Sequence, residues 1–469
     1  MMDRLRIIGG GLAGCEAAWQ AAQLGAQVTL YEMRPHVSTG AHRTANFAEL
    51  VCSNSLRSTS LENAVGLLKE EMARLGSLIV TAARATAVPA GGALAVDRER
   101  FSRYVEERLL AHPLIEMRRE EVQTLEFSDP VIVACGPLAS PALAAALARL
   151  CGKPHLHYFD AASPIVSADS IDRSCVFAAS RYGKGGEDYL NIPLDEQQYL
   201  QLVEDLVTSP KAQPHGVVDE PTEEAMPYFE GCLPVEEMAR RGPDTLRFGP
   251  LKPVGLHAPQ LAEPVGGDWQ IAPSRPYAVV QLRRENAAGT AYNMVGFQTR
   301  LTWPAQKSTF GKLPGLANAE WLRLGVMHRN TFVDAPRVLN ADLSLRNAHN
   351  VFLAGQISGC EGYVEAAATG MLAAHNACRR LAGKSEMFSP PPTTALGSLL
   401  AYLCDETSAD FQPQSVSFAY MAPLPEKVRD KRERRRRLAQ RALCEIDKIV
   451  ADLVAGDRAV APIAKDLVS

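Results

Sequence analysis

A glycine-rich turn near the N-terminus restricts the folds open to this chain more than any other feature. Residues 4–8 form a short apolar run that leads directly into Gly9-Gly-Gly-Leu-Ala-Gly14. An alanine-rich segment that predicts a helix over residues 12–24 follows, and a second apolar run over 27–31 ends at Glu32. A strand, a G-x-G-x-x-G turn, a helix and a second strand in this order predict a βαβ unit that binds a dinucleotide. A glycine turn without a ligand is the alternative, but it does not explain why all four parts fall in register.

The predicted unit offers donors for a pyrophosphate and an acceptor for a ribose. The glycines permit a tight turn, and the helix N-terminus presents backbone N–H groups and a favourable dipole to the phosphates. Glu32 lies 18 residues after the last glycine, where a carboxylate can accept hydrogen bonds from ribose hydroxyls. The candidate cofactor residues in this unit are Gly9, Gly10, Gly11, Leu12, Ala13, Gly14 and Glu32.

A second strand-to-glycine unit near the other end of the chain favours FAD over NAD as the dinucleotide. The apolar run 351–354 reaches Gly355 and Gln356, and a stretch that contains Gly362 leads into an alanine-rich helix predicted over 364–381. Two-part FAD domains of the glutathione-reductase type end in this way, with a late strand, turn and helix directed at the flavin and pyrophosphate. Gly355, Gln356 and Gly362 are therefore further candidate cofactor residues, and an ordinary buried strand–helix connection is the alternative.

The positions of the two units divide the chain. Residues 1–154 and 325–395 are expected to form the two parts of the FAD-binding domain, with a strand within 130–137 and the sheet resuming near Arg337. Residues 155–324 hold short strands, turn-forming Pro and Gly, and aromatic residues, which predicts an inserted α+β domain. Residues 396–469 predict a helical tail that is basic from Glu426. The expected fold is α/β: a Rossmann-like FAD-binding domain, an inserted α+β domain and a basic helical C-terminal tail.

The composition restricts the expected cellular location of the protein and the kind of partner that it binds. No stretch of 18 apolar residues occurs, and the βαβ unit accounts for the N-terminal apolar run, so we expect neither a membrane segment nor a signal peptide. The ten cysteines show no close C-x-x-C pairing, which argues against a metal site and fits a reducing cytoplasm. Residues 426–441 hold nine Lys/Arg against three Asp/Glu, so this segment carries +6 and the remainder of the chain −10. Arg434, Arg435, Arg436 and Arg437 encircle the predicted helix and suit contacts to phosphates, with a solvated helix face as the alternative.

Two of the cysteines lie in uncommon settings. Cys52 lies in Glu49-Leu-Val-Cys-Ser-Asn-Ser55, and Cys232 precedes a predicted short helix whose first residue is Pro234. A thiol at a helix N-terminus feels the positive end of the dipole, which favours the nucleophilic thiolate. Two buried cysteines that act as small apolar residues are the alternative.

With the FAD unit and both cysteine motifs, the chain resembles the bacterial folate- and FAD-dependent tRNA uracil-5-methyltransferases, the TrmFO family. The resemblance extends over most of the chain, and the cysteine motifs are specific to that family rather than to flavoproteins in general. It rests on residues 8–16, 47–56, 228–239, 245–255, 286–289, 292–298, 325–332 and 361–365.

The resemblance implies a reaction with several co-substrates. It implies that 5,10-methylenetetrahydrofolate supplies a one-carbon unit to C5 of a uridine in tRNA, with the T-loop as the expected target. Reduced FAD would supply the electrons, and NAD(P)H would regenerate it. A paralogous enzyme acting on ribosomal RNA, an FAD-dependent oxidoreductase of a small metabolite, and an RNA-binding flavoprotein without catalysis are the alternatives.

The resemblance also assigns roles to residues. It implies that one thiolate adds to C6 of the uracil and that a nearby base removes the C5 proton. The place of Cys232 before a helix N-terminus favours it as the nucleophile, with Cys52 as the base, although the reverse assignment stays open. His328, Arg329 and Asn330 are candidates for a folate or RNA pocket, and Arg247 and Lys252 are candidates for phosphate contacts. A structural role is the alternative for each of these five residues.

Overall fold

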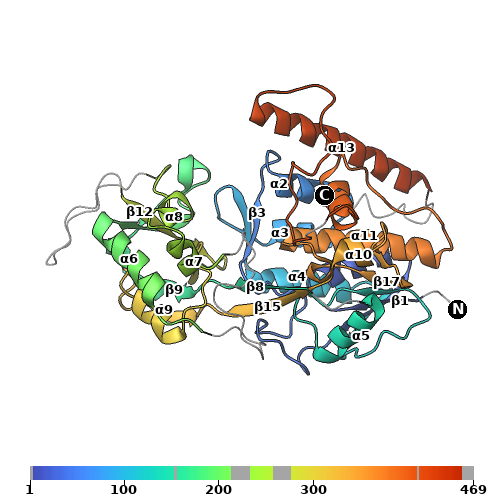
Figure 1. Ribbon diagram of the computed structural model, residues 1–469, viewed down its shortest axis with the longest axis horizontal. Coiled ribbons are helices and arrows are strands. Elements are labelled where there is room, and N and C mark those ends of the chain that lie inside the picture. Colours follow the sequence, from blue (N-terminus) through green and yellow to red (C-terminus); the bar gives the residue numbers. More distant parts are fainter. Residues whose placement is uncertain (1–3, 153–155, 213–232, 257–275, 409–410, 457–469) are drawn as a thin grey trace.

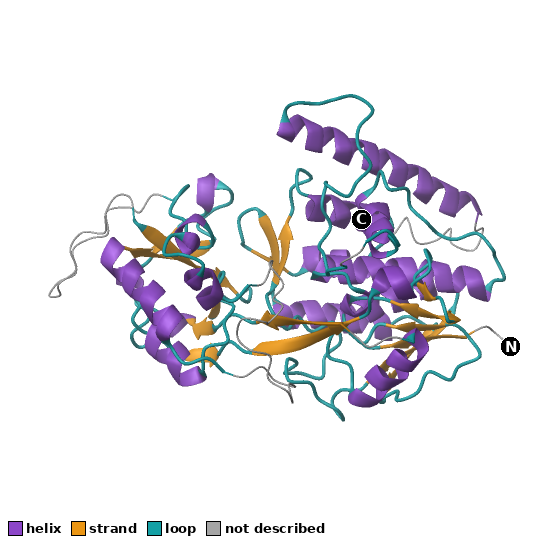
Figure 2. Cartoon of the chain, viewed as in Figure 1, coloured by secondary structure: helices purple, strands orange, loops and turns teal. Residues whose placement is uncertain are grey.

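The computed structural model describes residues 4–152, 156–212, 233–256, 276–408 and 411–456. The chain forms two lobes, each with its own sheet and apolar core, and a two-stranded ribbon runs between them (Figure 1). Figure 2 shows these strands in orange, with helices packed around both sheets.

Six strands form the sheet of the larger lobe, in the order β16-β17-β7-β1-β2-β6. Their bounds are β16 (Ser344–Leu345), β17 (Ala348–Leu353), β7 (Val131–Val133), β1 (Arg4–Ile8), β2 (Gln27–Glu32) and β6 (Ile115–Arg119). Neighbouring strands are parallel except for the antiparallel β16–β17 pair. The short apolar runs fit this sheet because helices cover both faces of a parallel sheet and leave its central strands buried.

Helices and a small second sheet complete the larger lobe. Its helices are α1 (Leu12–Gln23), α2 (Ala64–Arg74), α3 (Leu78–Ala85), α4 (Arg98–Leu110), α5 (Pro141–Cys151), α10 (Ala335–Val338), α11 (Tyr363–Leu381), α12 (Ala395–Leu403) and α13 (Lys431–Gly456), with the 3-10 turn Gln356–Ser358. The small sheet consists of β3 (Ser55–Ser58), β5 (Ala93–Val96) and β4 (Ala87–Val88). The two alanine-rich helices α1 and α11 pack against each other so closely that a Cβ on Gly370 would lie 2.2 Å from Ala13 O.

The smaller lobe is built on an antiparallel sheet with the order β10-β11-β12-β13-β9-β14. Its strands are β10 (Phe177–Ala178), β11 (Tyr189–Leu194), β12 (Ala278–Arg284), β13 (Ala291–Met294), β9 (Ile165–Ser167) and β14 (Trp321–Arg323). Its helices are α6 (Glu196–Thr208), α7 (Val235–Arg240), α8 (Thr245–Phe248) and α9 (Trp303–Phe310), with 3-10 turns at Ala168–Ser170, Arg173–Cys175 and Arg181–Gly183. The strands β8 (Leu156–Ala161) and β15 (Met327–Phe332) form the antiparallel ribbon between the lobes.

The predicted α/β fold and its first βαβ unit are confirmed, and three local predictions are wrong. Arg337 does not begin a strand: it lies in α10, where Pro336 occupies the first turn, and the sheet resumes at Ser344. Pro234 precedes α7 with an extended ψ of 142° instead of opening the helix. The tail helix starts at Lys431 rather than near Glu426, because the Asp430 carboxylate accepts the Glu433 N–H at 2.6 Å and caps the helix there. The domain limits at 154, 324 and 395 stay predictions.

Candidate functional site

A pocket lies at the carboxyl ends of the parallel strands, where the chain crosses over to opposite sides of β1. Its walls come from the β1–α1 turn, the end of β2 and the loops that follow β7 and β17. Eight of the candidate cofactor residues line it: Gly9, Gly10, Gly11, Leu12, Ala13, Glu32, Gly355 and Gln356. The structure therefore brings both predicted glycine units, from opposite ends of the chain, to one pocket.

The glycines of the first turn have different physical roles. A Cβ on Gly9 would lie 2.4 Å from Ala134 O, and a Cβ on Gly14 would lie 1.8 Å from Gly9 O, so both permit close backbone packing. A Cβ on Gly11 would meet nothing within 4 Å. Gly11 is the N-cap of α1, and no side chain caps this helix. The open space above Gly11 and the uncapped N–H groups fit the close approach of a pyrophosphate, as an FAD site requires.

Gly14 and Gly362 do not lie among the described residues of the pocket lining. Gly14 instead packs α1 against the turn, as above. Gly362 is the N-cap of α11, with a φ of 114°, and precedes Tyr363, which does line the pocket. Both glycines therefore support the elements that carry lining residues, without lining the pocket themselves.

Glu32 is held by an arginine that sequence reasoning missed. Its Oε2 accepts the Gly10 N–H at 2.9 Å, and its Oε1 accepts the Arg34 Nε–H at 2.9 Å. Arg34 also donates to Glu49 Oε2 at 3.0 Å, so one guanidinium joins two carboxylates of the pocket. Burial raises the pKa of Glu32, but the hydrogen bonds and charge of Arg34 outweigh it and hold the pKa below its usual value. Glu32 is therefore an ionised acceptor, as ribose binding requires.

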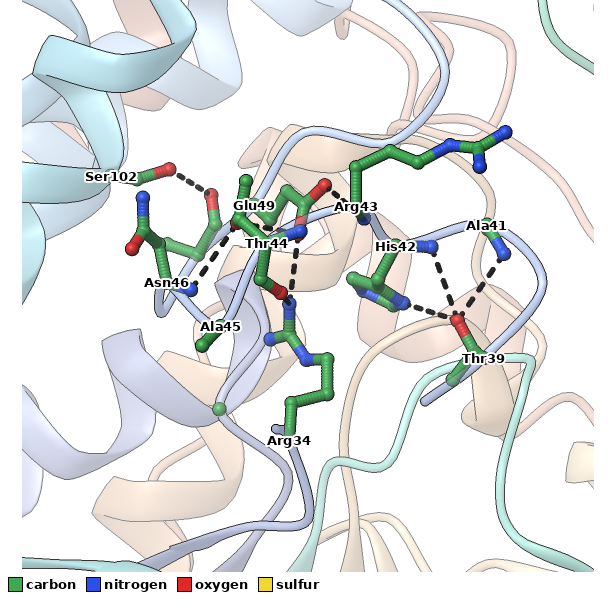
Figure 3. Close-up of polar contacts among 12 residues, drawn as sticks. Arg34, Thr39, Ala41, His42, Arg43, Thr44, Ala45, Asn46, Glu49 and Ser102 are labelled. Carbon is green, nitrogen blue, oxygen red and sulfur yellow. Dashed lines mark hydrogen bonds and ion pairs between the residues drawn. The ribbon is translucent and has the colours of Figure 1, made fainter. Parts of the chain in front are cut away.

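The loop after β2 is held by its own hydrogen bonds (Figure 3), and Thr39, His42 and Glu49 from this loop line the pocket. Glu49 accepts the backbone N–H groups of Arg43 at 2.8 Å and Thr44 at 3.1 Å. Thr39 Oγ1 lies 2.6 Å from His42 Nδ1, and both residues line the pocket. Burial, followed by the charge of Arg34, lowers the pKa of His42 to about 4, so this imidazole is neutral at physiological pH.

Cys52 lies beside the pocket, next to the lining residue Val51. Its backbone N–H donates to the Tyr363 hydroxyl at 2.8 Å, and the Ser53 N–H donates to the same oxygen at 3.1 Å. Burial, followed by the charge of Cys52, raises the pKa of Tyr363, so its hydroxyl stays protonated. Through Tyr363, the first turn of α11 connects the dinucleotide pocket to the cysteine motif.

Three guanidinium groups from separate parts of the chain interact electrostatically with the Cys52 thiol: Arg98, Arg283 and Arg323. Arg98 donates to Cys52 O at 3.2 Å and pairs with Glu285, and Arg323 donates to Val51 O at 2.6 Å. Burial lowers the pKa of Arg283 and of Arg323, and the charge of Cys52 opposes this change. Positive charge around a thiol favours the thiolate form, so Cys52 has the surroundings of a reactive cysteine.

The residues that follow Cys52 join the two lobes. Arg283 on β12 donates to Ser53 Oγ at 2.7 Å and to Asn54 Oδ1 at 2.9 Å, and Asn54 Nδ2 donates to Arg284 O at 2.8 Å. The Cys-Ser-Asn motif therefore fixes the thiol between the parallel sheet and the antiparallel sheet. This contact explains why a short polar motif directly follows the cysteine.

The second predicted cysteine, Cys232, lies outside the described residues. The helix expected to follow it is present as α7, whose first-turn residue Glu236 accepts hydrogen bonds from Thr299 Oγ1 at 2.8 Å and from the Arg300 N–H at 2.7 Å. Burial raises the pKa of Glu236. The role of Cys232 stays a prediction.

The predicted folate and RNA residues lie on several elements. His328, Arg329 and Asn330 fall on β15, where Asn330 is buried, and the side chains of His328 and Arg329 lie outside the described part. Arg247 has a structural contact: its guanidinium lies 3.9 Å from the centre of the Tyr277 ring, and its Nε donates to Tyr277 O at 3.0 Å. Lys252 directly follows the turn after α8 and lies in no helix or strand.

The four tail arginines differ in their surroundings. Arg434 and Arg435 line a groove, whereas Arg436 and Arg437 pair with Glu433 at 2.6 and 2.8 Å. Within the described ranges, no three His, Cys, Asp or Glu side chains gather as metal ligands, and no helix has the length and apolar character needed to cross a bilayer.

Sequence reasoning does not identify the polar and charged side chains that surround the predicted residues: Arg34, His42, Glu49, Arg98, Arg283, Arg323 and Tyr363. Glu49 and Tyr363 lie within the motifs of Cys52 and Gly362, so their proximity in sequence is a signal that could identify them. The three arginines around Cys52 carry no such signal, because only the fold brings them together.

The two glycine units, the shared pocket and the thiol beside it define a two-part dinucleotide-binding protein of the flavoprotein class. Residues 4–385 match the family model of glucose inhibited division protein A, GIDA. Among curated relatives, "Methylenetetrahydrofolate--tRNA-(uracil-5-)-methyltransferase TrmFO" of Heliobacterium modesticaldum is 53% identical, over 95% of this chain and 98% of its own length. The protein of the same name from Geobacter sulfurreducens is 52% identical, over 96% of this chain and 100% of its own length. The chain therefore belongs to the GidA family and, within it, to the TrmFO proteins.

A solved structure supports the fold. Aquifex aeolicus GidA in its form II crystal superposes with a TM-score of 0.69 at 16% identity, covering 99% of this chain and 75% of that chain. At this level of identity the likeness concerns the fold alone.

Proposed function

We propose that this chain transfers a one-carbon unit from 5,10-methylenetetrahydrofolate to C5 of a uridine in tRNA and yields the 5-methyl base. Membership of the TrmFO proteins supports the reaction, since both relatives carry it in their names. The observation on this chain that carries the proposal is the Cys52 thiol, which lies beside a dinucleotide pocket and among three guanidinium groups.

The pocket at the β1–α1 turn is the proposed FAD site. The N–H groups at the start of α1 would hold the pyrophosphate, Glu32 would accept the ribose hydroxyls, and Gly355 and Gln356 would contact the flavin part. When bound in its reduced form, FAD supplies the electrons that convert the transferred carbon into a methyl group, with NAD(P)H as their proposed source.

The two thiols are proposed to act on one uracil ring. C5 of uracil is a poor nucleophile until a thiolate adds to C6 and places electron density on C5. Cys232 is the proposed nucleophile, and Cys52 is the proposed base that takes the C5 proton after the carbon has been attached. The guanidinium groups around Cys52 also support the reverse assignment, because they favour a thiolate there before the substrate binds.

The target uridine has to leave its stack to reach a thiol beside a buried cofactor, as in other enzymes that act on a base. We propose tRNA rather than ribosomal RNA as the substrate because both relatives name tRNA. His328, Arg329 and Asn330 are proposed contacts of the folate or the RNA. The scattered cysteines support a reducing, cytoplasmic location.

Purified protein tests the proposal directly. The flavin absorbance of the protein establishes the cofactor, and a uridine-containing tRNA transcript with methylenetetrahydrofolate and NADPH establishes the reaction. We expect 5-methyluridine only when methylenetetrahydrofolate is present. Methylation supported by S-adenosylmethionine alone would overturn the proposal, and NAD(P)H turnover that needs neither cysteine would indicate an oxidoreductase of a small metabolite.

A further inference from the structure

A basic groove lies outside the dinucleotide pocket, between α13, the loop 416–428 and the start of α2. Figure 1 shows α13 lying along the side of the larger lobe that carries α2. A buried face of Leu438, Ala439, Ala442 and Ile446 packs the helix there. Two exposed ion pairs flank this contact: Arg74 on α2 with Asp447 and Arg432 with Glu62, each at 2.7 Å. The groove has a volume of about 890 Å³, which is too large for a single ion and suits part of a polymer.

Five cations line the groove: Arg57, Lys427, Lys431, Arg434 and Arg435. The single acid among the described lining residues, Glu426, is engaged by Arg437 at 2.8 Å. Lys427, Lys431 and Arg434 are exposed and form no ion pair with any residue that the structure describes. The groove therefore carries an excess of positive charge from Lys427, Lys431 and Arg434. In contrast, Arg432, Arg436 and Arg437 on the same helix are paired with carboxylates.

The groove also reaches the cysteine site through buried contacts. Arg57, whose side chain is 41% exposed, pairs with the fully buried Glu365. Glu365 also accepts the Val416 N–H at 3.0 Å and lies in the first turn of α11, two residues from the Tyr363 whose hydroxyl accepts the Cys52 N–H. The first turn of α11 therefore connects Arg57, in the wall of the groove, to the backbone N–H of Cys52.

We infer that this groove binds the sugar–phosphate backbone of the RNA substrate, with Arg434 and Arg435 as contacts. Arg436 and Arg437, which pair with carboxylates, make no contact with that backbone. The inference rests on the proposed function, because a uridine presented to Cys52 has to continue as a strand away from that site. Phosphates match the unpaired guanidinium and ammonium groups in charge and hydrogen-bonding geometry. Arg435 lies 5.9 Å from the centre of the half-buried Phe418 ring, so an aromatic face also lies within the groove.

Two double variants of one helix test the inference, because they remove the same charge from neighbouring positions. We expect R434A/R435A to weaken binding of an unmodified tRNA transcript about tenfold and to lower the salt dependence by about two phosphate contacts. R436A/R437A should weaken binding less, by no more than about threefold, through long-range charge and through the release of the groove acid Glu426 from Arg437. Filter binding over a range of salt concentrations measures both, and thermal melting verifies that both variants fold.

The outcomes separate the groove from the proposed function. In R434A/R435A, a higher KM for the transcript with an unchanged kcat would support RNA binding by the groove. Equal effects of the two pairs, or an effect of the R436A/R437A pair alone, would overturn the groove while leaving methylation by the unaltered protein intact. Failure of the unaltered protein to bind the transcript would overturn both. If R434A/R435A lost binding to polyglutamate as much as binding to RNA, the inference about the groove would also be overturned, because the groove would then bind anions in general.

Discussion

Two glycines, three residues apart in one turn, should respond in opposite ways to the same added methyl group. Gly11 has a φ of −78°, which any residue adopts, and its Cβ would meet nothing within 4 Å. The Cβ of Gly14 would lie 1.8 Å from Gly9 O, a backbone atom that cannot move without shifting the turn. Gly11→Ala therefore probes the space reserved for the cofactor, and Gly14→Ala probes the packing of the turn itself.

The magnitudes follow from this geometry. For Gly11→Ala in the cofactor-free protein, the gain of about 0.4–1 kcal/mol from a stiffer unfolded chain is offset by the poorer N-cap, so the free energy of unfolding should change by less than about 1 kcal/mol. FAD affinity should fall by about tenfold or more, because overpacking a tight contact costs about 1–3 kcal/mol. Gly14→Ala should lose about 3 kcal/mol or more of stability, because backbone rather than a side chain has to give way.

Thermal melting of the cofactor-free proteins and titration with FAD measure the two effects separately. Gly11→Ala should melt within about 3 °C of the unaltered protein and lose its yellow colour on gel filtration. Gly14→Ala should melt several degrees lower. An unchanged FAD affinity in Gly11→Ala, or an equal loss of stability in both variants, would refute the assignment of the pyrophosphate to this turn.

Two further perturbations follow from buried or crowded charges. Glu71 accepts the N–H groups of Ala395 and Leu396 at 2.8 Å, and burial raises its pKa from 4.5 to about 7, so the folded state binds more protons than the unfolded state in this range. The free energy of unfolding should therefore fall by up to about 3 kcal/mol as the pH rises from about 4.5 to about 7. Glu71→Gln should lack this loss. In urea melts, a difference between the unaltered protein and Glu71→Gln that does not change with pH would contradict the predicted direction. Arg323→Gln should slow alkylation of Cys52, followed by peptide mass mapping, because one cation that favours the thiolate is gone. An unchanged Cys52 rate, with the exposed Cys444 as internal reference, would count against the guanidinium surroundings.

The sequence predicts the cofactor unit well because its determinants are local. Glycines at fixed spacing, an alanine-rich helix and apolar runs each act over a few residues, so they can be recognised without the rest of the fold. The start of α13 is also predictable from the sequence, because Asp430 followed by Glu433 is a typical N-cap pattern, although it lies within a run of basic residues.

The surroundings of Cys52 could not be predicted in this way. Arg98, Arg283 and Arg323 come from α4 and from two strands of the other lobe, and no periodic pattern relates them. The division of the tail arginines depends on how α13 is rotated against the larger lobe, and the buried Ala439, Ala442 and Ile446 determine that rotation. Long-range charge and helix rotation are tertiary properties, so the sequence indicated a basic tail but not which of its cations are available.

The central claim, that two thiols act on one uracil ring, is tested most directly by trapping the protein on RNA. A transcript containing 5-fluorouridine cannot release the C5 substituent as a proton, so the covalent adduct accumulates and mass spectrometry can identify the attached cysteine. We expect the adduct on Cys232, its persistence in Cys52→Ala and its absence from Cys232→Ala. A stable adduct in Cys232→Ala would contradict the assignment of the nucleophile, and the absence of any adduct in the unaltered protein would contradict the two-thiol account as a whole.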